Sequence, residues 1–162
     1  MPKTRHVSTS RVIAADRQAI FDVIADPAMH PVIDGSGSVT QAVTDGPERL
    51  AEGVSFGMKM KMGAPYTIDN TVVEFEEGRR IAWRHFSGHR WRYELEDVEE
   101  GTKVTETFDW STARSKLGIE LAGFPKRNLE GMRRTLERLE EHLVGASDGA
   151  DVADVADEAD EA

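Results

Sequence analysis

The longest amphipathic pattern in the chain runs through residues 124–145, FPKRNLEGMRRTLERLEEHLVG. Apolar residues recur in it at spacings of three and four, which places them on one face of a helix. This apolar face comprises Leu129, Met132, Leu136, Leu139 and Leu143. Pro125 fits the first turn, and Gly145 suits the left-handed residue that ends many helices. A helix of about 20 residues is about 30 Å long, so its apolar face needs an extended surface to lie on.

The preceding residues predict a sheet as that surface. Seven stretches alternate between apolar and polar residues, at 6–14, 39–44, 54–62, 66–76, 80–86, 90–98 and 103–110. Most are separated by short turns, which join antiparallel neighbours. Two short helices are predicted after the first strand, at 17–26 and 27–33, with Asp16 as the first N-cap. We therefore predict an α+β fold with the element order β-α-α-β6-α.

This element order predicts a cavity. A strongly twisted antiparallel sheet of about seven strands curls, and one helix of about 30 Å covers only part of its concave face. The two short helices and the loops then close the remainder. We expect a ligand cavity between the sheet and the C-terminal helix.

The charge of the chain is concentrated at its C-terminal end. Seven acidic residues and no basic residue lie in 148–162, so a net charge of only −3 remains for the rest of a chain whose total is −10. The segment is of low complexity and too polar to order itself. We predict one domain at 1–145 and an acidic disordered tail at 146–162. The remaining arginines are dispersed, which disfavours a nucleic-acid partner.

Composition excludes several other classes of site. The chain has no cysteine, so it has no disulfide, thiolate nucleophile or cysteine-based metal site. His85 and His89 stand alone across a turn, and we predict no metal and no cofactor. No apolar run reaches the length of a membrane span, and no apolar segment follows the basic N-terminus, so we expect a cytoplasmic protein. The sequence does not distinguish a monomer from a homodimer.

Four segments carry a resemblance to a known family. They are SRVIAA at 10–15, AIFDVIADPAMHPVIDGSG at 19–37, NTVVEFEEGRRIAWRH at 70–85 and TKVTETFDWS at 102–111. With the element order, they resemble the START-like, helix-grip superfamily (SRPBCC), and within it proteins of the polyketide cyclase/dehydrase type. The resemblance covers about residues 6–144. It implies a helix-grip fold and a cavity for a hydrophobic small molecule such as a lipid, polyketide or steroid.

The inward faces of the predicted elements supply candidate ligand contacts. They are Arg11, Phe56, Met58, Met60, Asp69, Thr71, Trp83, Trp91, Tyr93, Phe108, Leu129 and Met132. The methionines suit an adaptable pocket but equally suit an ordinary core. Trp83 is compatible with core packing alone, whereas the Tyr93 phenol needs a hydrogen-bond partner when buried. Asp69 is expected at the cavity mouth.

Two charged residues, Glu106 and Arg11, interrupt faces that are otherwise apolar. A buried charge needs a partner, a neutral form or water. In a cavity they can bind a ligand carbonyl or move a proton; the alternative is a structural ion pair or an outward-facing register. His85 can shuttle a proton, or it can be a solvent-exposed histidine. Glu106 and His85 are the catalytic candidates.

Three functions remain open at this stage. The first is a binding or carrier protein for a small hydrophobic ligand. The second is an enzyme of the cyclase/dehydratase type, in which Glu106 or His85 acts as base and Arg11 or Tyr93 polarises a carbonyl. The third is a protein-interaction module. An apolar cavity favours a carrier, convergent polar groups in the cavity favour an enzyme, and a filled core with an exposed apolar patch favours an interaction module.

Overall fold

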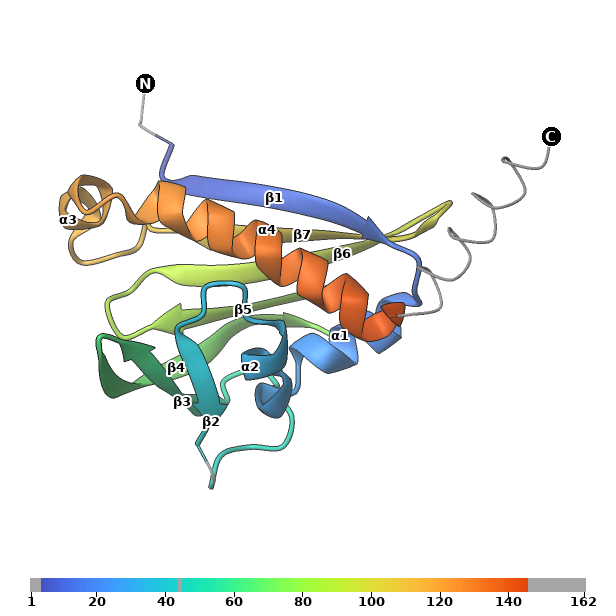
Figure 1. Cartoon of the computed structure of the whole chain (residues 1–162), viewed down its shortest axis with the longest axis horizontal. Coiled ribbons are helices and arrows are strands. Elements are labelled where there is room, and N and C mark those ends of the chain that lie inside the picture. Colours follow the sequence, from blue (N-terminus) through green and yellow to red (C-terminus); the bar gives the residue numbers. More distant parts are fainter. Residues whose placement is uncertain (1–3, 44, 146–162) are drawn as a thin grey trace, which may run out of the picture.

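The computed structural model describes residues 4–43 and 45–145, which form a curled sheet wrapped around a long helix (Figure 1). The seven strands are β1 (His6–Ile13), β2 (Val39–Ala42), β3 (Ser55–Met62), β4 (Ala64–Glu76), β5 (Arg80–His85), β6 (Arg90–Val98) and β7 (Gly101–Asp109). Their order in the sheet is β1-β7-β6-β5-β4-β3-β2, and every neighbouring pair is antiparallel. The predicted helix-grip architecture is confirmed.

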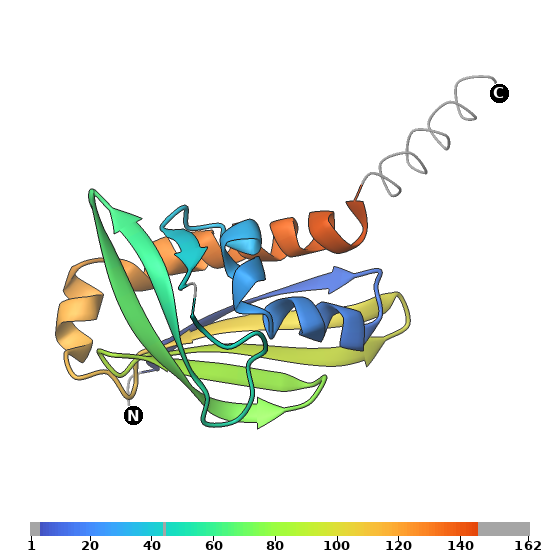
Figure 2. The ribbon, with the colours of Figure 1, turned by 90° about the horizontal axis from the view of Figure 1, so that it is seen from below.

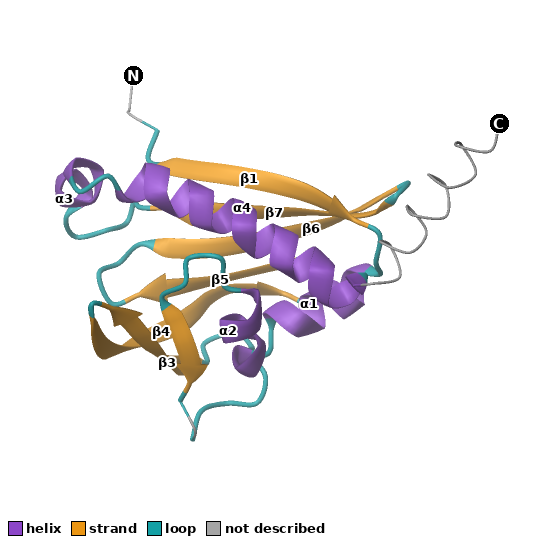
Figure 3. Cartoon of the chain, viewed as in Figure 1, coloured by secondary structure: helices purple, strands orange, loops and turns teal. Residues whose placement is uncertain are grey.

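The helices lie on one side of this sheet (Figures 2 and 3). They are α1 (Arg17–Ile24), the 3₁₀ turn η1 (Pro27–Met29), α2 (His30–Ile33), α3 (Lys116–Leu121) and α4 (Phe124–Leu143). The long helix α4 follows β1 and β7, while α2 packs beside β2 and against α4. The concave face is therefore covered by α4 at one edge and by the short helices at the other.

The sequence explains how α4 is placed. Met132, Leu136 and Leu139 are buried, as the apolar stripe predicts. The helix begins directly after Gly123, whose φ of 74° gives the chain a sharp left-handed turn that few other residues adopt. At the other edge, the Asp16 carboxylate caps α1 by accepting hydrogen bonds from the N–H groups of Gln18 and Ala19.

Strand β4 differs from its predicted orientation. The alternation predicts Thr71 on the core face, whereas Asn70 and Val72 are the buried residues there. A register irregularity between Val72 and Glu74 shifts the pattern, so that only the last part of the strand follows the expected face. A bulge of this kind inserts one residue and reverses the facing of all residues on one side of it.

The core has two parts. The larger cluster fills the space under α1, α2 and the C-terminal half of α4, and it includes Phe21, Ile81 and Leu139, each with no exposed surface. The smaller cluster contains Phe108, Trp110, Ala113 and Met132 near the N-terminal half of α4. The candidate site lies where the aromatic residues of these clusters leave space.

Two of the sequence predictions concern the C-terminal tail and membrane-spanning segments. The predicted acidic tail at 146–162 lies outside the described residues. Among the helices of the described residues, none combines the length and the apolar character needed to cross a membrane.

Candidate ligand-binding site

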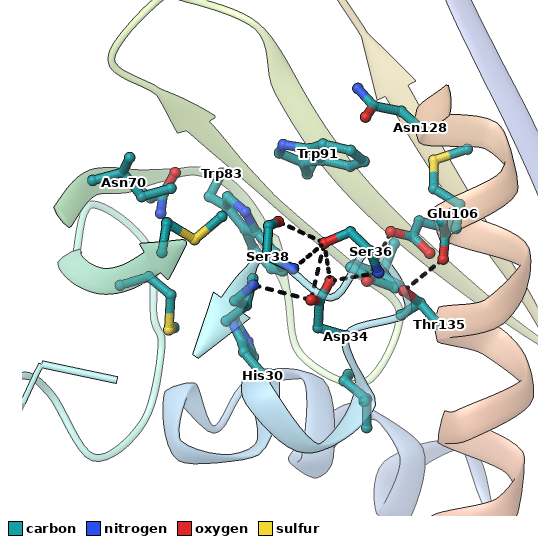
Figure 4. A pocket seen from close by; sticks show the side chains of 18 of the residues that line it. His30, Asp34, Ser36, Ser38, Asn70, Trp83, Trp91, Glu106, Asn128 and Thr135 are labelled. Atoms are coloured by element: carbon teal, nitrogen blue, oxygen red, sulfur yellow. Dashed lines mark hydrogen bonds between the residues drawn. The ribbon is translucent and has the colours of Figure 1, made fainter. Parts of the chain in front are cut away.

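A cavity of about 160 Å³ lies between the concave face of the sheet, α4 and the segment that joins α2 to β2. It is only partly enclosed, so solvent reaches one side. Its apolar and aromatic walls are formed by Ile33, Val39, Phe56, Met58, Met60, Ile68, Trp83, Trp91 and Met132. Its polar lining comes from His30, Asp34, Ser36, Ser38, Asn70, Tyr93, Glu106, Asn128 and Thr135 (Figure 4).

The polar centre of the cavity is a buried pair on neighbouring strands. The hydroxyl of Tyr93 on β6 donates a hydrogen bond of 2.9 Å to Oε1 of Glu106 on β7. Burial raises the pKa of Glu106 to about 8; the Tyr93 hydrogen bond opposes this, and the nearby Asp34 adds to it. The Glu106 carboxyl is therefore neutral at pH 7. Its second oxygen, Oε2, is buried and has no hydrogen-bond partner among the described residues.

A second unsatisfied polar atom belongs to Asn70 on β4. Its side chain is 4% exposed, and Oδ1 has no hydrogen-bond partner in the described part of the chain. Buried polar atoms are almost always paired in native proteins, so an orphan that borders a cavity points to a missing partner there. Two residues of the cavity lining, Glu106 and Asn70, thus each carry a buried side-chain oxygen atom without a hydrogen-bond partner among the described residues.

The segment after α2 forms a hydrogen-bonded polar rim. Asp34 accepts hydrogen bonds from the backbone N–H of Ser36 and Val39 and from the Ser36 hydroxyl, whose Oγ lies 2.6 Å from that of Ser38. Figure 4 shows this network beside α4. The Asp34 side chain therefore holds the backbone of this segment in place at the edge of the cavity.

A close contact with α4 fixes this rim. The N–H of Gly35 donates to the hydroxyl oxygen of Thr135 at 2.9 Å, and Thr135 donates to the carbonyl of Gly131. A Cβ at Gly35 would lie 2.4 Å from the Gly131 carbonyl oxygen, so only glycine permits this approach. The short chain segment is thereby held against the helix, and the rim of the cavity is defined.

His30 forms part of the aromatic wall. Its Nε2 lies 2.8 Å from the carbonyl oxygen of Ile24, which can only accept, so Nε2 carries the proton. The ring stacks on Trp83, with 5.0 Å between ring centroids, and meets Phe56 edge-on. Burial lowers the pKa of His30, which keeps the ring neutral.

The cavity lining contains no arginine or lysine among the described residues, and its acidic groups are Asp34 and Glu106. It thus offers an anionic ligand no counter-charge. The described residues also include no group of three or more histidine, cysteine or acidic side chains that could hold a metal ion.

The comparisons with known proteins agree with this architecture. A family model described as polyketide cyclase / dehydrase and lipid transport matches residues 4–144. The chain belongs to this family. It is also 39% identical over 141 residues to the uncharacterized protein Rv0088 of Mycobacterium tuberculosis, covering 83% of this chain and 62% of that protein. The chain thus spans less than two thirds of the length of that relative.

Solved structures show that this chain shares its fold with distant proteins. One from Rhodobacter sphaeroides is 16% identical, with a TM-score of 0.69 over 88% of this chain and 93% of that one. Protein Ms6760 of Mycobacterium smegmatis is 17% identical, with a TM-score of 0.68 and the same coverage. An AHSA1-like protein of Aeromonas hydrophila is 22% identical, with a TM-score of 0.58 over 82% and 92%. At these identities the likeness establishes the fold.

Eight of the residues predicted from sequence line the cavity of this family member. They are Phe56, Met58, Met60, Trp83, Trp91, Tyr93, Glu106 and Met132. The methionine stripe ends at Met60, because Met62 is 44% exposed at the tip of the β3–β4 hairpin. Glu106 faces inward without a cation partner among the described residues, so the alternatives of an ion pair and of an outward register are wrong for it.

Three polar candidates lie outside the cavity lining. Arg11 faces α4 as predicted, but its guanidinium donates two hydrogen bonds of 3.1 Å to Glu140 at the surface. Asp69 and Thr71 lie on the opposite face of β4 from the cavity residue Asn70, because of the bulge; Asp69 is exposed and Thr71 pairs with the Ser55 hydroxyl. For Arg11, the structural ion pair is therefore the correct alternative.

The other three candidates belong to the smaller cluster or border it. Phe108 is buried among Trp110 and Met132, and Leu129 packs against this cluster. His85 is half-buried and stacks on His89, with 4.5 Å between ring centroids. Burial lowers the pKa of His85 to about 4, so the ring is neutral at pH 7. His85 is not among the residues that line the cavity.

Apart from Tyr93 and Glu106, the sequence interpretation missed the polar part of the lining. Asp34, Ser36 and Ser38 lie in DGSGS, which reads as a helix-breaking turn. Asn70 was hidden by the bulge in β4. One signal was present: Asn128, Gly131 and Thr135 recur at spacings of three and four beside the apolar stripe of α4, as small and polar residues on the face that borders a cavity.

Proposed function

We propose that this protein binds a small hydrophobic or aromatic molecule in the cavity between the sheet and α4. The observation that carries the proposal is the combination of aromatic and methionine walls with two buried, unpaired oxygen atoms, Glu106 Oε2 and Asn70 Oδ1. Ligand sites are typically apolar pockets with a few placed polar groups. The family description, which names lipid transport beside cyclase and dehydrase activity, supports binding as the shared property.

The experiment that tests binding replaces a residue of the cavity wall by a larger one, so that the new side chain fills the cavity. Met60 lines the cavity, whereas Met62 lies on the same strand, two residues further on, and is exposed. Native mass spectrometry of the protein purified from its own host, followed by identification of any released compound, reports the bound molecule. We expect Met60→Trp to lose the bound compound and Met62→Trp to keep it. Equal occupancy in both variants would place the compound elsewhere and contradict the proposal.

A second function, acid–base turnover of the bound molecule, is favoured by one observation. Glu106 lines the cavity as a neutral carboxyl with a pKa of about 8, and its Oε2 has no hydrogen-bond partner among the described residues, which are properties of a general acid. In a reaction of the cyclase/dehydratase type, it would protonate a carbonyl that undergoes aldol closure, or a hydroxyl that leaves as water. Once a bound compound is known, Glu106→Gln should abolish its turnover while retaining its binding. Unchanged turnover would remove Glu106 from the reaction.

A further inference from the structure

The two unpaired oxygen atoms of the cavity lie on opposite sides of it. Glu106 belongs to β7 and Asn70 to β4, and β6 and β5 lie between them in the sheet. Neighbouring strands are about 4.8 Å apart, so these two strands are about 14 Å apart when measured along the curled sheet. Figure 4 shows Asn70 at one side of the pocket and Glu106 at the other, with Trp83 and Trp91 between them in this view. A single ligand that satisfies both must therefore have polar groups at two ends.

The surroundings of Glu106 decide what the first polar group is. Tyr93 donates to Oε1, which makes Oε1 the accepting oxygen of the carboxyl. The side chain is 3% exposed, and no arginine or lysine lines the cavity among the described residues, so the neutral form is favoured. The proton then resides on Oε2, which has no partner in the described part of the chain. The matching ligand group is an acceptor, such as a carbonyl oxygen.

Asn70 decides the second polar group. Its unpaired buried atom is Oδ1, an amide oxygen that can only accept a hydrogen bond. The matching ligand group is a donor, such as a hydroxyl. Leaving this oxygen unpaired in the complex would cost binding free energy, so a ligand that lacks the donor is disfavoured.

The walls and the volume define the body of the ligand. Trp83, Trp91, Phe56 and the neutral ring of His30 present aromatic surfaces, which favour a flat ring by stacking and edge contacts. The volume of about 160 Å³ is close to that of an engineered cavity of about 150 Å³ that binds benzene. Such a space suits one or two rings better than a long acyl chain. The acidic lining also disfavours a carboxylate or phosphate.

We propose that the cavity selects an uncharged aromatic molecule of one or two rings that carries a carbonyl oxygen for Glu106 at one end and a hydrogen-bond donor for Asn70 at the other. This inference rests on the proposed binding function and narrows it to a chemical class. It separates the protein from carriers of fatty acids and phospholipids, whose ligands bring a negative charge and a long chain.

Five probes test the class. Para-hydroxyacetophenone carries both groups, acetophenone lacks the hydroxyl, para-ethylphenol lacks the carbonyl, para-hydroxybenzoate replaces the acetyl group by a carboxylate, and dodecanoate represents a chain lipid. Binding is measured by NMR titration of the isotope-labelled full chain, at a pH well below the Glu106 pKa of about 8. We expect para-hydroxyacetophenone to bind best, with each missing group weakening binding about three- to tenfold, as one hydrogen bond does. The benzoate and dodecanoate should bind most weakly.

Two variants test which polar group of the ligand contacts Asn70 and which contacts Glu106. Asn70→Leu should remove the advantage of para-hydroxyacetophenone over acetophenone and leave the affinity for acetophenone nearly unchanged. Glu106→Leu should remove the advantage of para-hydroxyacetophenone over para-ethylphenol. Thr71→Val, on the outer face of the same strand as Asn70, is the matched control and should change neither preference.

The pH dependence of ligand affinity tests the hydrogen bond to Glu106, because contacts made by packing alone do not change with pH. Acetophenone has no titratable group, so its pH dependence comes from the protein. The titratable groups that act on Glu106 are Tyr93 from β6 and Asp34 from the rim. The neutral His30 lines the same cavity, and α4 presents Asn128, Met132 and Thr135 to it. Affinity for acetophenone should fall as pH rises through about 8, when Oε2 loses its proton. Glu106→Gln, which keeps a donor, should abolish this fall.

The outcomes separate the two proposals. If dodecanoate or para-hydroxybenzoate binds the cavity as well as para-hydroxyacetophenone does, the class is wrong while the binding function stands. If the hydroxyl preference survives Asn70→Leu, the assignment of the ends is overturned. If no probe shifts the signals of the cavity residues, and the protein from its own host carries no compound that Met60→Trp releases, both proposals fail.

Discussion

The Tyr93 hydroxyl donates a 2.9 Å hydrogen bond to Oε1 of Glu106 from the directly opposed position on the neighbouring strand. Both side chains are buried, and burial raises the pKa of each, that of Tyr93 well above its usual value. The phenol therefore stays protonated, and the carboxyl is neutral at pH 7. This pair fixes one proton donor beside the aromatic and thioether groups of the cavity wall.

Glu106 makes the stability of the fold dependent on pH. Its pKa is about 8 in the folded state against 4.5 for an unperturbed carboxyl, so between these values the folded state binds more protons than the unfolded one. The free energy of unfolding therefore decreases as pH rises, by up to about 1.4 kcal/mol per pH unit from this group. Chemical denaturation should show a stability advantage of Glu106→Gln over the wild type that grows between these values.

The difference between the two proteins cancels every other titrating group, which makes it a direct measure of Glu106. Tyr93→Phe is the companion variant. It removes the hydrogen bond that lowers the pKa of Glu106, so the fall in stability should extend to higher pH. A difference between Glu106→Gln and wild type that does not change with pH would mean that Glu106 is ionised in the folded state.

The contact between Gly35 and α4 predicts opposite effects on its two sides. A methyl group at Gly35 would lie 2.4 Å from two backbone atoms of the helix, so Gly35→Ala should destabilise the fold by about 1–3 kcal/mol. At Gly131 a methyl group meets Ser36 at an ordinary 3.5 Å. Gly131→Ala should therefore be neutral or stabilise by about 0.5–1 kcal/mol, because alanine favours helix. Thermal unfolding of both variants checks this.

The architecture was predictable because its determinants are local. Apolar residues alternate along most strands, and the turns between β4, β5, β6 and β7 are short enough to require antiparallel neighbours. The stripe on α4 identified the helix that the sheet surrounds. The bulge in β4 was not predictable, because an inserted residue leaves two alternations that each look regular.

The site was only half predictable for a related reason. Phe56, Met58 and Tyr93 were identified because large apolar residues on an inward face signal a core or a cavity. The polar lining depends on how Gly35 and Thr135, one hundred residues apart in the chain, are brought together, and no local pattern reports that. Arg11 and Glu106 both interrupt apolar faces, yet only Arg11 has an oppositely charged partner, Glu140, whereas Glu106 pairs with the Tyr93 hydroxyl. Glu140 lies on a helix turn that sequence alone does not align with Arg11.

The stacked pair His85 and His89 predicts sensitivity to acid. Burial lowers the pKa of His89 to about 3, from 6.5, and the neighbouring His85 contributes. Below pH 6.5 the unfolded state binds a proton that the folded state does not, so stability is lost as pH falls, by up to about 1.4 kcal/mol per pH unit. His89→Gln should reduce this loss in denaturation measurements at acidic pH. His142→Gln, on the exposed last turn of α4, is the control and should leave the acid profile nearly unchanged.

The ion pair between Arg11 and Glu140 separates stability from binding. Both side chains are partly exposed, at 40% and 28%, so the pair should contribute about 1 kcal/mol or less and should weaken in salt. Arg11→Gln and Glu140→Gln should each lower the free energy of unfolding slightly, and the double variant should lose no more than their larger effect, because the interaction is lost only once. Since neither residue lines the cavity, ligand affinity should be the same in all three variants as in the wild type. A substantial loss of affinity in Arg11→Gln with none in Glu140→Gln would show that the guanidinium leaves Glu140 and reaches the ligand.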